Sequence, residues 1–296
     1  MKNLEDFIRP TQKKLFKLLV KKFKGKSIFS KGNFILVRGT APVMLVAHLD
    51  TVHTEPVKQI CASDDGNILM SPQGIGGDDR CGVFALLKIH QSAQVKPWLL
   101  FCCNEEVGGL GAQHFCQAHS QKLLPKELDS LKFLIEIDRK GKNDAVFYDC
   151  DNPDFEDFIV SKGFQTAFGS FSDISLIAPE LGVAAVNLSS GYYNAHTLHE
   201  YINVSELHET IRRVGEIIAE VSDLPCFEYV EAMAILPEPH ESIGSQPRYV
   251  SDSFVDIYEV LLNFYSSAEL ESFRKEFGDK VLWQLYEEEI APFYQR

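Results

Sequence analysis

VMLVAHLDTVH, residues 43–53, decides the fold. Residues 43–47 are all apolar, which is typical of a central strand in a parallel sheet, because both faces of such a strand are buried. His48 and Asp50 follow directly, where the predicted strand ends. In open α/β sheets, ligands bind just outside the carboxyl ends of the strands. The stretch therefore predicts a buried strand that delivers two polar side chains to a site.

Apolar runs of the same kind recur along the chain, and helical patterns separate them. We predict strands at 33–38, 43–47, 57–62, 67–71, 97–103, 132–137, 145–149 and 183–188. We predict helices at 79–93, 109–119, 153–162, 173–178 and 205–222, and an amphipathic helix over 3–24 that restarts near Pro10. This alternation indicates an α/β fold, with three αβα layers and a mostly parallel, mixed central sheet.

The domain organisation follows from proline content. We expect a single catalytic domain over residues 1–224, a linker over 225–251 and a helical C-terminal extension over 252–296. The linker segment contains Pro225, Pro237, Pro239 and Pro247. The extension is rich in Phe, Tyr and Glu, and we expect it to pack on the catalytic domain, with a dimer interface or a lid as the alternatives.

Composition excludes several classes of protein. The net charge of −13 argues against nucleic acid and against an anionic membrane surface as partners. The seven cysteines are scattered without a C-x-x-C pair, which indicates a reducing compartment and no disulfide framework. The sequence has no secretory h-region and no apolar run of membrane-spanning length. We therefore expect a cytoplasmic protein that acts as a monomer or a homodimer.

Acids and histidines follow five of the predicted strand ends. They are His48 with Asp50, Asp78 with Asp79, Glu105 with Glu106, Asp138, and His196. Each group alone has an ordinary structural explanation, such as a helix cap or a solvated turn. Together they would place several carboxylates in one cleft, where they repel strongly unless a cation neutralises them. The joint pattern therefore favours a metal site of His, Asp and Glu ligands, which suits Zn²⁺.

These segments resemble the clan of co-catalytic zinc exopeptidases that includes peptidase T, the carboxypeptidase G and aminoacylase family, and the secreted leucine aminopeptidases. HLDTV resembles the first motif of the clan, GGDDRCG its bridging-aspartate motif, and NEEVGGLGA its Glu-Glu motif. EIDR and NAHTLHEY resemble the two segments that complete the ligand set. The likeness covers about residues 40–215 and keeps the order of the motifs.

The resemblance implies the following roles. His48 and Asp138 bind one metal ion, Glu106 and His196 bind the other, and Asp78 bridges them. Asp50 orients His48, and Glu105 is the general base. The ions are two Zn²⁺, with Co²⁺ or Mn²⁺ as alternatives. The likeness also implies a cis peptide bond after Asp78, and it makes Asp79 a helix-start or supporting acid.

Relatives in this clan often insert a lid or dimerisation domain, which supplies substrate contacts. Residues 51–77 and 139–195 are too short for such an insertion here, so we expect none. Asp173 in the loop FGSFSDIS, with Tyr193 and Asn194 before His196, are our candidates for substrate binding. Capping of the next helix is the alternative for Asp173, and core packing is the alternative for the other two.

The sequence thus predicts a metallopeptidase with two zinc ions, an aminopeptidase or a di- or tripeptidase that hydrolyses short peptides. The resemblance implies that aspartate at position 138 is commoner in the clan's aminopeptidases and di- or tripeptidases, and glutamate in its carboxypeptidases and deacylases, so Asp138 favours recognition of a free amino terminus. The alternatives are an N-acyl amino acid amidohydrolase with the same ligands and a non-catalytic binding protein on the same fold. A cysteine hydrolase using Cys81 is a weaker alternative, because no histidine can be assigned to it.

Overall fold

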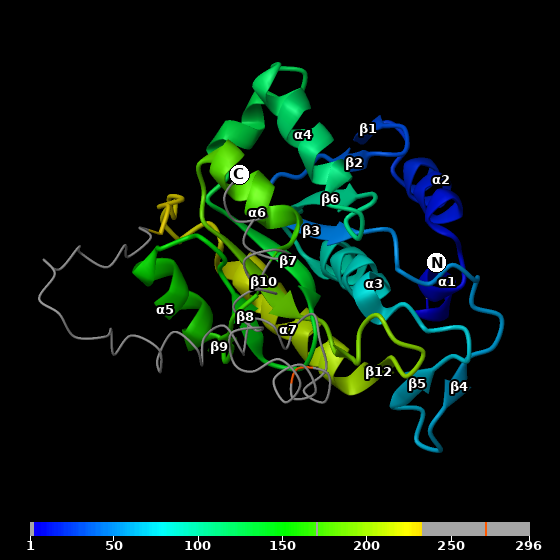
Figure 1. The fold of residues 1–296 in the computed structure, drawn as a ribbon. Coiled ribbons are helices and arrows are strands. Elements are labelled where there is room, and N and C mark those ends of the chain that lie inside the picture. The colour runs from blue at the N-terminus through cyan, green and yellow to red at the C-terminus, as the bar shows by residue number, and fades with distance from the viewer. Residues whose placement is uncertain (1–2, 170, 233–269, 271–296) are drawn as a thin grey trace, which may run out of the picture. The chain divides into compact units, whose positions relative to one another are not determined.

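The central sheet of the computed structural model carries the site (Figure 1). The structure describes residues 3–169, 171–232 and 270, and the account below concerns the compact unit formed by residues 3–167 and 171–232. The strand order is β1-β2-β6-β3-β7-β10-β8-β9. These strands are β1 (Ser27–Ser30), β2 (Phe34–Val37), β3 (Val43–His48), β6 (Trp98–Cys102), β7 (Phe133–Arg139), β8 (Asp144–Val146), β9 (Gln165–Thr166) and β10 (Ala185–Ser189).

The middle of this sheet is parallel, and its edges are mixed. β3 pairs in parallel with both β6 and β7, and β7 pairs in parallel with β10. β2 joins β6 in antiparallel register, and β8 joins β10 in the same way. The carboxyl ends of β3, β6 and β7 therefore meet at one edge of the sheet, where ligands bind in open α/β folds.

Helices cover both faces of the sheet, so the predicted three-layer α/β fold is confirmed (Figure 1). Alternate residues of each strand point to opposite faces: in β3, Leu45 packs on one side, and Met44 on the other. One face packs on α4 (Leu110–Ser120) and α6 (Asp173–Leu181). The other packs on α1 (Glu5–Ile8), α2 (Gln12–Lys22), α3 (Gly77–Ser92), α5 (Pro153–Ser161) and α7 (Val204–Glu220).

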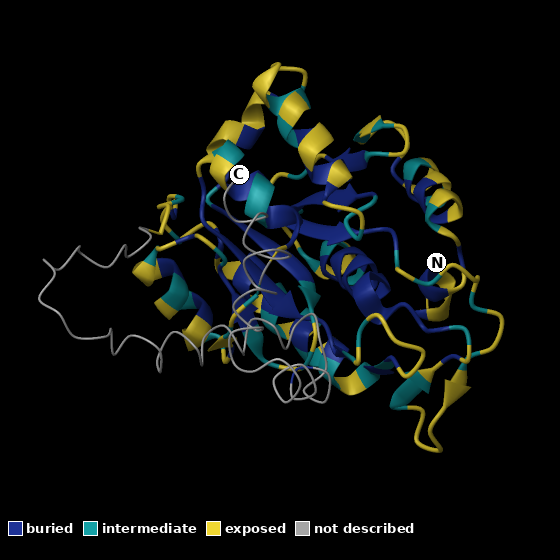
Figure 2. Cartoon of the chain, viewed as in Figure 1, coloured by how far each residue is buried: buried dark blue, intermediate teal, exposed yellow. Residues whose placement is uncertain are grey.

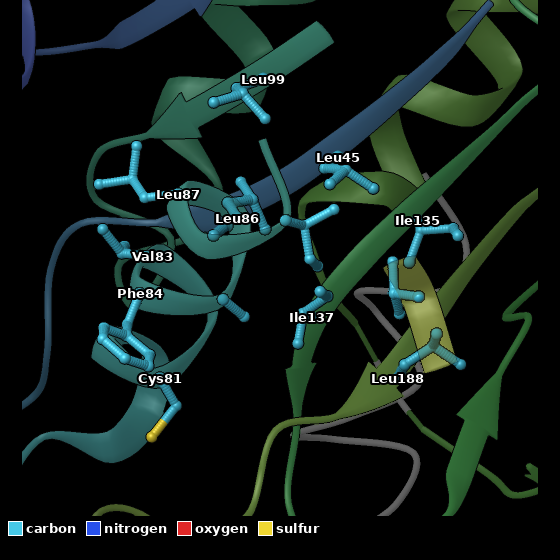
Figure 3. Packing of buried hydrophobic residues seen from close by; sticks show 14 of the residues in the cluster. Leu45, Cys81, Val83, Phe84, Leu86, Leu87, Leu99, Ile135, Ile137 and Leu188 are labelled. Carbon is cyan, nitrogen blue, oxygen red and sulfur yellow. The ribbon is translucent and has the colours of Figure 1, made fainter. Parts of the chain in front are cut away.

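Helix α3 forms the centre of the larger core. Figure 3 shows Val83, Leu86 and Leu87 of this helix beside Leu45 and Ile135 of the sheet. In Figure 2 the central strands are buried throughout, while the outer faces of the helices are exposed. Among the described residues, no helix has the length and apolarity needed to cross a bilayer.

A second, antiparallel sheet of order β11-β12-β5-β4 lies in the same unit. It consists of β4 (Cys61–Ala62), β5 (Ile68–Met70), β11 (Tyr192–Tyr193) and β12 (Tyr201–Asn203). The predicted strand 57–62 is thus only two residues long, because residues 57–60 run as irregular chain. The sequence did not predict β1, β9, β11, β12 or the 3₁₀ helix η1 (Lys126–Ser130).

The chain stays on the compact unit beyond residue 224. Phe227 accepts a hydrogen bond from the amide of Ala184 (2.8 Å) and donates one to the carbonyl of Lys132 (2.9 Å). Glu228 and Glu231 form isolated bridges with Val183 and Cys150. The first residues of the predicted linker therefore pack on the unit. The rest of it, and the predicted helices of 252–296 apart from residue 270, lie outside the described residues.

We predict that Phe155→Ala lowers the free energy of unfolding by about 3–5 kcal/mol. Phe155 is fully buried, and its ring lies 5.1–5.8 Å from those of Phe133, Phe147 and Phe227. Urea titration would measure the loss. Val160→Ala on the same helix is the control: Val160 is exposed, so we expect a change within about 0.5 kcal/mol. Equal effects of the two substitutions would contradict this account of the core.

Candidate metal centre

His48 is the last residue of β3 and is fully buried. Its Nε2 lies 3.0 Å from Asp78 Oδ1 and 3.5 Å from Asp138 Oδ1. Its Nδ1 lies 3.4 Å from Asp50 Oδ1, close enough for an ion pair but outside hydrogen-bond geometry. The strand end thus brings together the histidine and the three aspartates that the sequence predicts around it.

Asp78 reaches the site because the first turn of α3 is not helical. Asp78 and Asp79 have φ/ψ of −79°/104° and −116°/46°, and the peptide bond between them is cis, as the resemblance implied. Asp79 turns away from the site: its Oδ1 accepts from the amide of Gly82 (2.8 Å), and its Oδ2 accepts from the amide of His48 (3.2 Å). These contacts agree with a place at the helix start, the first of the two roles expected for Asp79, and its role as a supporting acid stays a prediction.

A glycine after these aspartates is required by packing. A Cβ at Gly82 would lie 2.1 Å from the carbonyl oxygen of Ile137 and 2.4 Å from Asp79 Oδ1. Close approach of α3 to β7 at this point holds Asp78 against Asp138 at the end of that strand. The motif GGDDRCG therefore combines a candidate ligand, an acid that accepts backbone hydrogen bonds, and a helix–strand contact that leaves no room for a side chain.

The remaining candidate ligands come from two loops. Glu106 follows β6, and its Oε2 lies 3.1 Å from His196 Nε2. His196 lies between β11 and β12 at φ 64°, and the same nitrogen is 3.2 Å from Asp78 Oδ2. Asp78 thus bridges the two histidines. Glu105 lies beside this arrangement, with Oε2 at 4.0 Å from His48 Nε2.

The described residues form three groups that could each hold a metal ion. They are His48, Asp78 and Asp138; Asp78, Glu106 and His196; and His48, Glu105 and Glu106. The first two groups share Asp78 and together contain the five ligands that the sequence predicts. The third draws on His48 and Glu106, which the first two already use. Filling the first two groups leaves Glu105 free.

The donor atoms fit a divalent cation. Asp138 Oδ1 and Glu106 Oε1 are buried without a hydrogen-bond partner. Unpaired buried carboxylate oxygens are costly, and coordination by a cation removes that cost. Two imidazoles and three carboxylates without a thiolate are ligands typical of zinc. The residues present therefore fit the metal that the resemblance implies.

The pKa values of these acids and histidines are shifted by their neighbours in the site. Burial favours the protonated acid, but the hydrogen bonds with His196 and His48 outweigh it and lower the pKa of Asp78 far below its usual range. Burial and then Asp78 raise the pKa of Asp138 well above its usual range. Hydrogen bonds with Asp78 and Glu106 raise the pKa of His196 to about 10. The carboxylates thus compete for positive charge, which a divalent cation would supply.

Two supporting carboxylates are fully engaged with the backbone. Asp50 accepts from the amides of Glu105 and Glu106, at 3.1 Å each. Glu200 is fully buried and accepts from the amides of Gly76 and Asp78, at 2.9 Å each, while His53 Nε2 lies 2.8 Å from it. Sequence reasoning did not assign Glu200, although its place four residues after His196 was the available signal. It fixes the loop that carries the bridging aspartate.

The three residues predicted to bind substrate are each packed or hydrogen-bonded within the protein. Asp173 is fully buried at the start of α6, where burial raises its pKa to about 6. Tyr193 stacks on Tyr201 (4.9 Å between ring centroids) and donates to Glu206 (2.6 Å). Asn194 accepts from the Thr197 hydroxyl and shapes the turn before His196. Their contact with substrate stays a prediction.

Asp173 lies next to a buried hydrogen-bond network that reaches the amide of Asp138. Burial, and then the nearby Asp173, raise the pKa of Glu136 to about 8. Ser172 donates to Glu136, and Asn187 bonds Ser172 while accepting from the amide of Asp138 (2.8 Å). The network therefore connects the start of α6 with the strand end that carries a ligand. Sequence patterns of single strands do not reveal it.

The cysteine-hydrolase alternative loses support from the same structure. Cys81 is fully buried, and burial followed by the charge of Asp79 raises the pKa of its thiol well above the usual range. The thiolate is the nucleophilic form of cysteine. Cys81 therefore remains a protonated core residue.

Residues 35–173 match the family model of peptidase family M28. The predicted resemblance to co-catalytic zinc exopeptidases is confirmed. The family match identifies the chain as a metallopeptidase, and a dinuclear, metal-dependent exopeptidase is consistent with it. A comparison with curated proteins gave no match.

Solved structures show the same fold. A tripeptidase from Staphylococcus aureus is 15% identical with a TM-score of 0.57, and the match covers 75% of this chain and 97% of that one. Aminopeptidase PepT from Bacillus cereus is 16% identical with a TM-score of 0.56, over 74% and 97%. An aminopeptidase from the archaeon Desulfurococcus kamchatkensis is 16% identical with a TM-score of 0.53, over 73% and 93%.

We predict that Glu200→Ala weakens zinc binding about 10- to 100-fold, because supporting partners of a metal site typically contribute that much. The substitution leaves the buried amides of Gly76 and Asp78 without acceptors. Chelator competition would measure the affinity. Glu216→Gln on the exposed surface of α7 is the control and should bind zinc like the unmodified protein. Unchanged zinc affinity in Glu200→Ala would show that the loop carrying Asp78 keeps its conformation without the hydrogen bonds to Glu200.

Proposed function

We propose that the protein is an aminopeptidase or a di- or tripeptidase that uses two zinc ions, with Co²⁺ or Mn²⁺ as alternative metals. The observation that carries the proposal is the pair of ligand groups joined by Asp78, with Glu105 left over beside them. A binding protein would need no such unengaged carboxylate. Because aspartate rather than glutamate stands at position 138, we propose a free amino terminus as the recognised end.

A cavity next to the ligands supports a short peptide as the substrate. Its volume is about 530 Å³, within the range of about 300–1,000 Å³ that is usual for small-ligand sites. Asp50 and Glu106 line it at the metal end. Val52, Val57 and Val107 give it apolar surface. A short peptide with an apolar side chain fits such a lining.

The residues would divide the chemistry as follows. Two bound divalent cations would polarise the substrate carbonyl and lower the pKa of the attacking water. Glu105 takes the proton from that water and then donates it to the leaving amine. Burial raises the pKa of Glu105. A carboxylate with a raised pKa accepts a proton more readily, which suits a general base that later donates the same proton. Asp50 holds both the ring of His48 and the loop of Glu105 in place.

We further propose that the protein is cytoplasmic and that it is a monomer or a homodimer. The scattered cysteines of the sequence favour a reducing compartment. A dodecamer is recorded for one structural relative, so size measurement of the purified protein is needed to decide the assembly.

We predict that Glu105→Gln retains its metal and loses about 10²–10⁴-fold in kcat, because the amide cannot accept the proton. Hydrolysis of a tripeptide with a free amino terminus would be followed together with metal content by mass spectrometry. Normal turnover in this variant would overturn the assignment of the base.

We also predict about two zinc ions per chain, from the two ligand groups. Glu106→Ala should bind fewer ions than the unmodified protein, since Glu106 belongs to one group and not to the other. A single ion in the unmodified protein would limit the mechanism to one metal. Preference for N-acetylated amino acids over free-amine peptides would favour the amidohydrolase instead.

A further inference from the structure

Three consecutive backbone amides in the Glu105 loop are held by side-chain oxygens. The amides of Glu105 and Glu106 donate to the two oxygens of Asp50, and the amide of Asn104 donates to Gln12 Oε1 at 3.1 Å. Gln12 Nε2 in turn donates to Asn104 Oδ1 at 3.0 Å. Asn104 has a φ of 60°, a conformation that L residues adopt rarely. The reciprocal amide pair therefore stabilises an unfavourable backbone state directly before Glu105.

The segment that carries Gln12 is itself fixed to the other acidic loop. Arg80 is 4% exposed and lies two residues after Asp78. Its Nη1 donates to the carbonyl of Phe7 in α1 and to that of Pro10 in the break between α1 and α2, at 2.9 Å each. Thr11 then caps α2, since its hydroxyl accepts from the amide of Lys14 (3.4 Å). One end of the segment is tied to the Asp78 loop, and the other to the Glu105 loop.

The same segment lines the cavity. Ile8, Pro10, Thr11 and Gln12 form part of its lining, together with Asn104 and Glu106. A group that enters the cavity toward Glu106 thus passes beside residues 8–12. In a chain without an inserted domain, this segment lies where substrate contacts are needed.

We infer that residues 8–12 contribute to the active site, and that Gln12 is the positioning residue for Glu105. Gln12 fixes the backbone of Asn104, and with it the direction of the next side chain. The inference rests on the proposed function, because the orientation of the Glu105 side chain affects turnover only if Glu105 is the general base. Residues 8–12 also form one wall of the path taken by the peptide.

The test uses two variants of one residue. Gln12→Ala removes both hydrogen bonds, whereas Gln12→Glu keeps an acceptor for the amide of Asn104, replaces the donor with a second acceptor oxygen and adds a negative charge. Lys13→Ala, an exposed neighbour on α2, is the control. Hydrogen–deuterium exchange of the peptide that spans residues 104–106 would be measured alongside kcat, KM, zinc content and thermal unfolding.

We expect faster hydrogen–deuterium exchange in Gln12→Ala, confined to the loop of residues 104–106. We also expect kcat to fall about 10- to 100-fold with little change in KM, because a small misplacement of a catalytic group slows the reaction by about this factor. Zinc content should not change. Gln12→Glu should recover most of both losses, which a general loss of stability would not do. Lys13→Ala should match the unmodified protein.

Unchanged exchange in Gln12→Ala would overturn the inference. So would a loss of kcat that follows zinc content or unfolding temperature, since Gln12 would then act only through stability. Accelerated exchange in a protein whose unmodified form hydrolyses no peptide would instead overturn the proposed function and leave the loop positioning intact.

Discussion

Repulsion between converging carboxylates is the constraint on which this structure depends. Asp78, Glu105, Glu106 and Asp138 meet at the carboxyl edge of the sheet, and within the described part of the chain the metal-binding groups that contain them include two imidazoles. In a buried setting such a cluster is unfavourable unless positive charge is supplied. The strand ends, the non-helical start of α3 and the irregular loops all serve to hold these groups together against that cost. Bound divalent cations would offset that cost.

The hydrogen bonds of each carboxylate separate ligands from supports. Asp50, Asp79 and Glu200 have both oxygens occupied by backbone amides, so neither oxygen is free to coordinate. Asp138 and Glu106 each retain a buried oxygen without such a partner. This pattern agrees with the roles that the sequence motifs imply for the acids they assign. Unsatisfied buried oxygens also occur at Glu136 and Asp173, which are not predicted ligands, so the pattern supports the assignment only together with the geometry of the site.

The sequence predicts most of the sheet, because the apolar runs of β3, β6 and β7 are long and the motifs end each of them. It does not predict β11 or β12, which are two and three residues long and have no periodicity to recognise. Glu200 was missed because its partners, Gly76 and Asp78, are more than 120 residues away in the chain. The prediction of a strand over 57–62 is wrong for residues 57–60, which form irregular chain despite their β-like composition. Local patterns identify ligands, whereas their supports depend on long-range contacts.

The start of α3 shows why those supports act together. Asp78 and Asp79 do not have helical φ/ψ, so three successive side chains diverge instead of following one helical path. Asp78 points to the histidines, Asp79 to the end of β3, and Arg80 to the carbonyls of Phe7 and Pro10. A shift of this one turn would therefore move the bridging ligand, the sheet contact and the wall of the cavity at once. Arg80 therefore links the N-terminal segment to the turn that carries the candidate ligand Asp78, although about 70 residues separate Arg80 from Phe7 and Pro10 in the sequence.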